Sequence, residues 1–165
     1  MILGIDPGLT QSGICLFDPI TGVVEAKGVL SHEQTRQFIK KQRHRIDLIG
    51  IERPLIYARM QPGTCLTLGT MLREVGRLEE TAARYKVPVY LISRADVLKQ
   101  IVGRRPSRGN KVSKRECQVA VSALLGLTKH ITPQHASDAA AVALAAWQLT
   151  RPLEVEDECI TPVAV

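Results

Sequence analysis

The chain opens with MILGIDPGLTQSG (residues 1–13), and this stretch decides the fold. Its first half is an apolar run that ends in one carboxylate, Asp6, and Pro7-Gly8 turn the chain directly afterwards. The pattern is typical of a strand that is buried on both sides and carries an acid at the rim of a sheet. Residues 12–17 and 23–30 predict two further strands, which complete an antiparallel meander.

A second carboxylate, Glu52, is delivered in the same way. It ends the apolar run 46–51, which follows a predicted helix that is capped by Ser31 and runs to about Arg43. A strand that arrives after a helix favours a parallel crossover beside the first strand. The sequence therefore predicts that Glu52 lies next to Asp6.

The third acid lies on the last predicted helix, which is rich in alanine. Thr132 as N-cap and Pro133 in the first turn predict its start, and it runs to about Leu149. His135 and Asp138 are three residues apart and project from one face of this helix. Because small apolar residues surround them, we expect both side chains to face inward or into a cleft. A metal ion would remove the cost of burying an unpaired aspartate.

These acids predict a centre for two divalent metal ions. Two strand-end carboxylates with a helix-borne His and Asp supply hard ligands and leave positions open for water and phosphate. Such a site hydrolyses phosphodiesters without a nucleophilic side chain. The sequence contains no G-x-x-x-x-G-K-[ST], G-x-S-x-G or H-E-x-x-H motif, which argues against P-loop nucleotide hydrolysis, acyl transfer and zinc proteolysis.

A basic segment, residues 103–115, contains six basic residues and no acidic one. Together with the net charge of +6 and the pI near 9.4, it predicts contacts with a phosphate backbone. The alternative is a mobile loop that only aids solubility. The candidate DNA-binding residues of the segment are Arg104, Arg105, Arg108, Lys111, Lys114 and Arg115.

The longest predicted helix spans residues 65–86 and contains Gly69 and Gly76 on one face. Glycines weaken a helix but allow another backbone to approach. They either pack against the sheet of the same chain or lie at a homodimer interface. A strand at 87–92 and a helix at 94–102 follow.

Length and composition predict one globular domain. With 165 residues, 45% of them hydrophobic, we expect one folded domain over residues 1–150, which carries the predicted metal centre, and a loosely packed or disordered tail over 151–165. The four cysteines are dispersed, which argues against a zinc knot or a disulfide framework. The chain also lacks an apolar run of membrane-spanning length and a secretory pattern, so we expect a soluble, cytoplasmic protein.

Several short motifs, taken in order, resemble the RuvC Holliday-junction resolvases. They cover residues 1 to about 149 and comprise Gly4-Ile-Asp-Pro-Gly8 with Ser12-Gly13, Ile51-Glu52, Pro88-Val89 with Leu98-Lys-Gln100 and Val102-Gly103, Gln118-Val119, and Pro133-Gln-His135-x-x-Asp138-Ala139.

The resemblance implies an α/β, RNase H-like fold. Its five-stranded mixed sheet would combine a three-strand antiparallel meander with parallel strands and be flanked by helices. It also implies a homodimer that cuts four-way DNA junctions by paired nicks, using Mg²⁺ or Mn²⁺. Asp6, Glu52, His135 and Asp138 fall on the family's metal-binding positions, and Lys99 on a lysine near the junction phosphates.

The chain also departs from the family pattern. Where the family has an aromatic wedge, this chain has Leu55, with Tyr57 two residues on, and Glu116 stands where a lysine is usual. Lys111, Lys114 or Arg115 could replace that lysine. The departures suggest a divergent member, encoded in a chromosome and nucleoid-associated or encoded by a phage, in which a branch-migration motor is a possible partner.

Two other functions are compatible with these residues. One is an RNase H-like nuclease for other substrates, such as flaps, branched RNA or RNA:DNA hybrids. The other is a junction-binding protein without catalysis, whose acids are vestigial.

Overall fold

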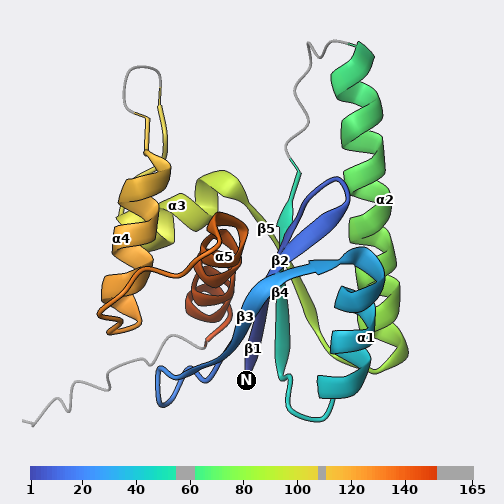
Figure 1. Cartoon of the computed structure of the whole chain (residues 1–165), viewed down its shortest axis with the longest axis horizontal. Coiled ribbons are helices and arrows are strands. Elements are labelled where there is room, and N and C mark those ends of the chain that lie inside the picture. Colours follow the sequence, from blue (N-terminus) through green and yellow to red (C-terminus); the bar gives the residue numbers. More distant parts are fainter. Residues whose placement is uncertain (55–61, 108–110, 152–165) are drawn as a thin grey trace, which may run out of the picture.

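The computed structural model describes residues 1–54, 62–107 and 111–151. Figure 1 shows a single twisted sheet with helices on both faces. The strands are β1 (Ile2–Pro7), β2 (Gln11–Phe17), β3 (Val24–Ser31), β4 (Leu48–Arg53) and β5 (Val89–Ser93). The helices are α1 (His32–Gln42), α2 (Pro62–Arg84), α3 (Arg94–Val102), α4 (Lys114–Leu124) and α5 (Gln134–Thr150).

The sheet has the order β3-β2-β1-β4-β5, with β1 in the centre. β1 pairs antiparallel with β2 and parallel with β4, and β5 extends the parallel half. The predicted mixed five-stranded sheet is therefore confirmed. The capping box of Ser31 and Gln34 at the start of α1 is confirmed as well.

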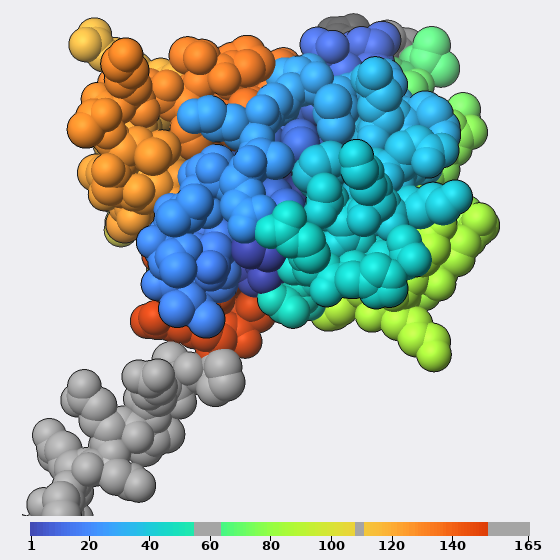
Figure 2. Space-filling model, turned by 60° about the horizontal axis from the view of Figure 1, so that its bottom comes forward, coloured from blue at the N-terminus to red at the C-terminus, as the bar shows by residue number. Residues whose placement is uncertain are grey.

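The helices form two unequal layers. α1 and α2 cover one face of the sheet, and α5 lies against the other face, with α3 and α4 packed on the outside of α5 (Figure 1). From a second direction, Figure 2 shows the hairpin of β2 and β3 in blue between α4 in orange and the segment from α1 to β4 in teal. None of the helices within the described residues is long and apolar enough to cross a membrane.

Successive side chains of β1 point to opposite faces of the sheet, as strand geometry requires, and they are larger on one face than on the other. Leu3 and Ile5 belong to the core under α1 and α2, whereas Ile2 belongs to the core around α5. Gly4 and Asp6 have the same parity as Ile2, so they lie on the α5 side. A Cβ atom on Gly4 would lie 2.0 Å from the carbonyl oxygen of Ala139 in α5. Backbone therefore meets backbone on this side.

The start of α5 differs from the prediction. Thr132 is not its N-cap, because the helix begins one residue later, at Gln134, and Pro133 takes the N-cap position with an extended backbone. The carbonyl oxygen of Pro133 accepts hydrogen bonds from the amides of Ala136 and Ser137. Proline has no side-chain acceptor, so no side chain caps this helix.

The prediction that Gly69 and Gly76 pack against the sheet is also wrong. Both glycines are exposed, and a Cβ atom on either would have no atom within 4 Å. In Figure 1 the N-terminal half of α2 rises above α1 and stands clear of the other helices. Its side chain Leu66 is 78% exposed.

Candidate metal centre

The parallel register between β1 and β4 brings the first two acids together. Ile5 pairs with Ile51, so Asp6 and Glu52 follow at the same end of adjacent strands. Both strands carry a glycine two residues before the acid, on the same face. Gly4 and Gly50 each leave room for α5, since a Cβ atom on Gly50 would lie 2.6 Å from the Cβ of Ala146.

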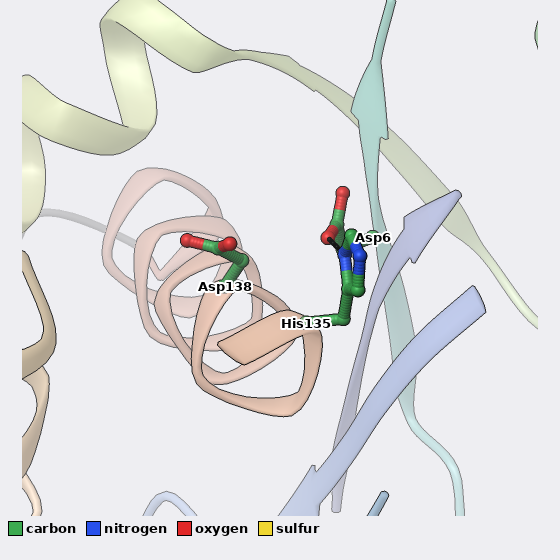
Figure 3. A group of neighbouring side chains, drawn as sticks. All are labelled: Asp6, His135 and Asp138. Atoms are coloured by element: carbon green, nitrogen blue, oxygen red, sulfur yellow. Dashed lines mark hydrogen bonds and ion pairs between the residues drawn. The ribbon is translucent and has the colours of Figure 1, made fainter. Parts of the chain in front are cut away.

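α5 supplies the remaining two predicted ligands from its first turns. His135 Nδ1 lies 2.8 Å from Asp6 Oδ2, and Figure 3 shows these two side chains pointing toward each other. An ionised carboxylate only accepts, so Nδ1 carries the hydrogen and Nε2 keeps a free lone pair for a metal. Asp138, one turn further on, is buried, and Gln134 Nε2 donates to its Oδ2 at 3.5 Å.

Asp6, His135 and Asp138 could share one metal ion. Each offers a ligand atom, and these atoms lie within 4.8 Å of one another. Glu52 is not part of any such group within the described residues. The four predicted ligands thus fall into a compact group of three and a separate fourth.

Arg94 connects Glu52 to Asp138, and sequence reasoning missed it. Its Nη1 donates to Glu52 Oε2 and to Asp138 Oδ1, both at 3.3 Å, and its Nη2 also lies 3.3 Å from Asp138 Oδ1. Arg94 is the first residue of α3, directly after the N-cap Ser93. Ser93 ends β5 opposite Arg53, the residue after Glu52 in β4, so the strand order would have pointed to Arg94.

Burial makes the acids costly to ionise. It raises the pKa of Glu52 to about 7, with Arg94 acting in the opposite direction. Burial also raises the pKa of Asp6 in spite of the hydrogen bond from His135. For Arg94, burial opposes the charged form, but Glu52 and Asp138 outweigh it and raise the pKa. One guanidinium therefore faces three carboxylates, and the centre as a whole favours further positive charge.

The acids line an open cavity of about 450 Å³. α2 contributes one wall with Thr64, Thr67, Leu68 and Met71, and Lys114 at the start of α4 also lines the cavity. Lys99 is exposed in the last turn of α3 and does not line it.

Two arginines of the basic segment are held by acids. Arg104 pairs with Glu116 at 2.7 Å, and Arg105 pairs with Asp96 at 2.5 Å. Exposed ion pairs of this kind are weak, so a phosphate could replace either acid. Arg108, Leu55, Tyr57 and the tail after Arg151 lie outside the described residues.

Comparison with known proteins identifies the family of the chain. The family described as "Crossover junction endodeoxyribonuclease RuvC" matches residues 2–146. The chain belongs to the RuvC family. A RuvC of Paenarthrobacter aurescens is 28% identical over 163 aligned residues, which cover 89% of this chain and 81% of that protein. A RuvC of Corynebacterium diphtheriae is 27% identical over 157 residues, covering 86% and 90%.

Solved RuvC structures have the same fold. A structure described as "T. thermophilus RuvC in complex with Holliday junction substrate" superimposes with a TM-score of 0.66 at 22% identity, over 87% of this chain and 90% of that one. A second Thermus thermophilus RuvC structure gives 0.63, also at 22% identity, over 87% and 91%. The RNase H-like architecture implied by the sequence is confirmed.

Proposed function

We propose that this RuvC-family chain is a metal-dependent endonuclease that resolves four-way DNA junctions by paired, symmetric nicks. The observation that carries the proposal is the convergence of Asp6, Glu52, His135 and Asp138 on one open cavity. Family membership supports the substrate class, since the matching family is named for crossover junctions. The basic segment beside the cavity supplies the charge that a DNA backbone requires.

The residues present fit Mg²⁺ or Mn²⁺. The donor set is dominated by carboxylate oxygens, which these ions prefer. Burial raises the pKa of Asp6 and Glu52, so a bound cation would offset the cost of ionising them. Asp6, Glu52, His135 and Asp138 would hold two ions. Bound ions supply activation of the attacking water and stabilisation of the leaving 3′ oxygen.

The protein itself orients these groups and binds the DNA. The hydrogen bond from His135 Nδ1 to Asp6 fixes the ring, so that Nε2 is presented as a ligand. Lys114 lines the same cavity and carries a charge that could contact the phosphate next to the scissile bond. Lys99 and the arginines of the basic segment would bind the junction arms outside the cavity.

Symmetric cutting requires two copies of the centre, and α2 is our candidate for the dimer interface. Gly69 and Gly76 lie on its exposed surface with open space above them, and Leu66 is an exposed apolar side chain on the same helix. Residues 66, 69, 73, 76 and 80 follow helical spacing along one stripe. A second α2 could approach this stripe closely.

Substitution of Asp6 tests the proposed chemistry. Asp6→Asn removes one ligand charge and little volume, so we expect cleavage of a labelled four-way junction in Mg²⁺ to fall by on the order of a thousandfold or more, while junction binding in a gel-shift assay is retained. Asp18→Asn is the matched control, because Asp18 lies on the exposed turn before β3. An Asp6→Asn protein that cuts at the control rate would refute the proposal.

A competition assay tests the substrate. Junction, flap, RNA:DNA hybrid and linear duplex are mixed in equal amounts, and the products of each are resolved on a gel. Preferential, symmetric nicking of the junction supports a resolvase. Faster cutting of another substrate would reassign the chain to a nuclease of different specificity.

A further inference from the structure

Arg94 lies between Glu52, the fourth predicted ligand, and Asp138, which belongs to the compact group of three. Its guanidinium is placed between Glu52 and Asp138, with all three nitrogen–oxygen distances at 3.3 Å. The side chain of Arg94 is 25% exposed, compared with 17% for Glu52 and 9% for Asp138. Arg94 is therefore a partly buried cation that neutralises Glu52 and Asp138.

The centre has two halves, the Asp6–His135–Asp138 group and Glu52 with the neighbouring Asp138, and they differ in the ligand atoms that they leave free for a cation. Asp6, His135 and Asp138 present ligand atoms within 4.8 Å of one another, and none of the nitrogen–oxygen contacts described for Arg94 involves Asp6 or His135. Glu52 is engaged by Arg94 instead. A cation that binds Glu52 together with Asp138 must therefore displace Arg94 or share both carboxylates with it.

We propose that Arg94 allows a divalent ion to bind at the Glu52 half only when DNA is present. Without DNA, the guanidinium holds Glu52 and Asp138, and only the Asp6–His135–Asp138 half binds a divalent ion tightly. A backbone phosphate entering the cavity gives the guanidinium another bidentate acceptor. Arg94 then releases Glu52 and Asp138, so that the second ion is held only when substrate is present.

The geometry of the side chain permits this exchange. Arg94 is rooted on a fixed backbone, since Ser93 Oγ caps α3 by accepting from the Asp96 amide at 3.2 Å. The guanidinium lines the open cavity, and three rotatable carbon–carbon bonds of the side chain separate it from that root. The contacts at 3.3 Å are longer than the 2.7–2.9 Å of tight charge-assisted bonds, which favours exchange of partners.

This inference rests on the proposed function, and counting bound ions tests it. Mn²⁺ is titrated into the full-length protein at pH 8, and binding is followed by calorimetry and by the paramagnetic resonance signal of free Mn²⁺. We expect one tight site in the wild type and a second that is at least tenfold weaker. In Arg94→Met, which keeps the length and loses the charge, the second site should tighten by roughly tenfold or more, because a nearby like charge is gone.

A junction with uncleavable linkages at the cutting position completes the test. Its addition should tighten the second site of the wild type more than that of Arg94→Met, because the phosphate is a ligand in both proteins but releases Glu52 and Asp138 only in the wild type. Arg84→Met is the control, since Arg84 is an exposed arginine paired with Glu80 on α2, and it should behave like the wild type. Arg94→Gln replaces Arg94→Met if thermal melting shows that the methionine variant does not fold.

The outcomes separate this inference from the proposed function. The role of Arg94 is refuted if Arg94→Met binds the second ion no more tightly than the wild type does, or if Arg94→Met binds fewer ions. Either result counts even when the wild type cuts junctions. If no variant binds Mn²⁺ and the wild type cuts nothing, the proposed function fails with it.

Discussion

Where the sheet meets α5, glycines of the strands contact the alanine-rich helix, whereas the face under α1 and α2 is lined by isoleucine and leucine. On the first face, Gly4, Gly13 and Gly50 bring the strands against the helix backbone. On the second face, bulky side chains hold the helices further away. The close face is the one that carries all the predicted metal ligands, so close backbone packing is what fixes their mutual positions.

The face under α1 and α2 also buries a carboxylate, but there it is paired within the protein. Glu74 of α2 is buried, with Arg36 Nη1 at 2.6 Å and His32 Nδ1 at 3.5 Å. His32 Nε2 contacts the carbonyl oxygen of Gly8 at 3.1 Å. A buried carboxylate that pairs with Arg36 and contacts His32 thus ties α2 and α1 to the turn that follows Asp6. The two faces therefore bury acids in different settings: around an open cavity on one face and between two helices on the other.

Gly4→Ala should break the close face and have the largest effect. The new methyl group would lie 2.0 Å from the carbonyl oxygen of Ala139 and 2.7 Å from the Cβ of Ala143. Because a backbone carbonyl cannot turn aside, we expect α5 to shift and the free energy of unfolding to fall by about 3 kcal/mol or more. Urea denaturation followed by circular dichroism measures this. A variant as stable as the wild type would show that α5 is not held by backbone contact.

Glu74→Ala tests the other face. It removes the acceptor of Arg36 and His32, so we expect a loss of about 1–3 kcal/mol in the free energy of unfolding. The loss should be smaller than for Gly4→Ala, since Arg36 is partly exposed and keeps its contact with Glu33 at 2.9 Å. Glu80→Ala, which removes an exposed acid of the same helix, is the control and should cost less than about 0.5 kcal/mol.

Glu52→Gln sharpens the comparison through pH. The folded protein raises the pKa of Glu52 to about 7 by burial, above its ordinary value of about 4.3. The native state therefore holds this proton more tightly than the unfolded state, and the wild type loses stability as pH rises from about 4.5 to about 7. Without metal, we expect Glu52→Gln to be more stable than the wild type at pH 8 by on the order of 1–3 kcal/mol, and equal to it near pH 4.

Thermal melting across this pH range measures the difference, and added metal is its control. Mn²⁺ at pH 8, at a concentration high enough to fill the weaker site at Glu52, should stabilise the wild type more than Glu52→Gln, because the ion compensates the buried charge. If the difference in stability between the two proteins were the same at all pH values, ionisation of Glu52 in the folded protein would cost no stability.

Sequence reasoning located the elements and the acids well. Alternating and continuous apolar runs are local signals, and the parallel crossover expected after the first helix placed Glu52 next to Asp6, as the pairing of β1 with β4 confirms. The start of α5 was wrong by one residue, since Pro133 displaced Thr132 as N-cap. Capping depends on backbone conformation, which side-chain identity only partly determines.

What the sequence did not reveal were contacts across the fold. In the sequence, Arg94 looks like any first-turn residue of a helix, and its partners lie 42 and 44 residues away. The pairs Gly4-x-Asp6 and Gly50-x-Glu52 did contain a usable signal. A glycine two residues before a strand-end acid clears the same face for a helix, which indicates from sequence alone where the third acid must approach.

Gly76→Ala should have the smallest effect and the opposite sign to Gly4→Ala. A Cβ atom here meets nothing within 4 Å, so the substitution gains helix propensity, and we expect an increase of about 0.8–1 kcal/mol in the free energy of unfolding of the monomer. If α2 forms the dimer, the methyl group would also intrude between two close backbones and weaken dimerisation. Analytical ultracentrifugation combined with urea denaturation separates the two effects. Higher stability with unchanged self-association would place the dimer interface away from Gly76, and lower stability at a protein concentration where the chain is monomeric would contradict the open space seen above this residue.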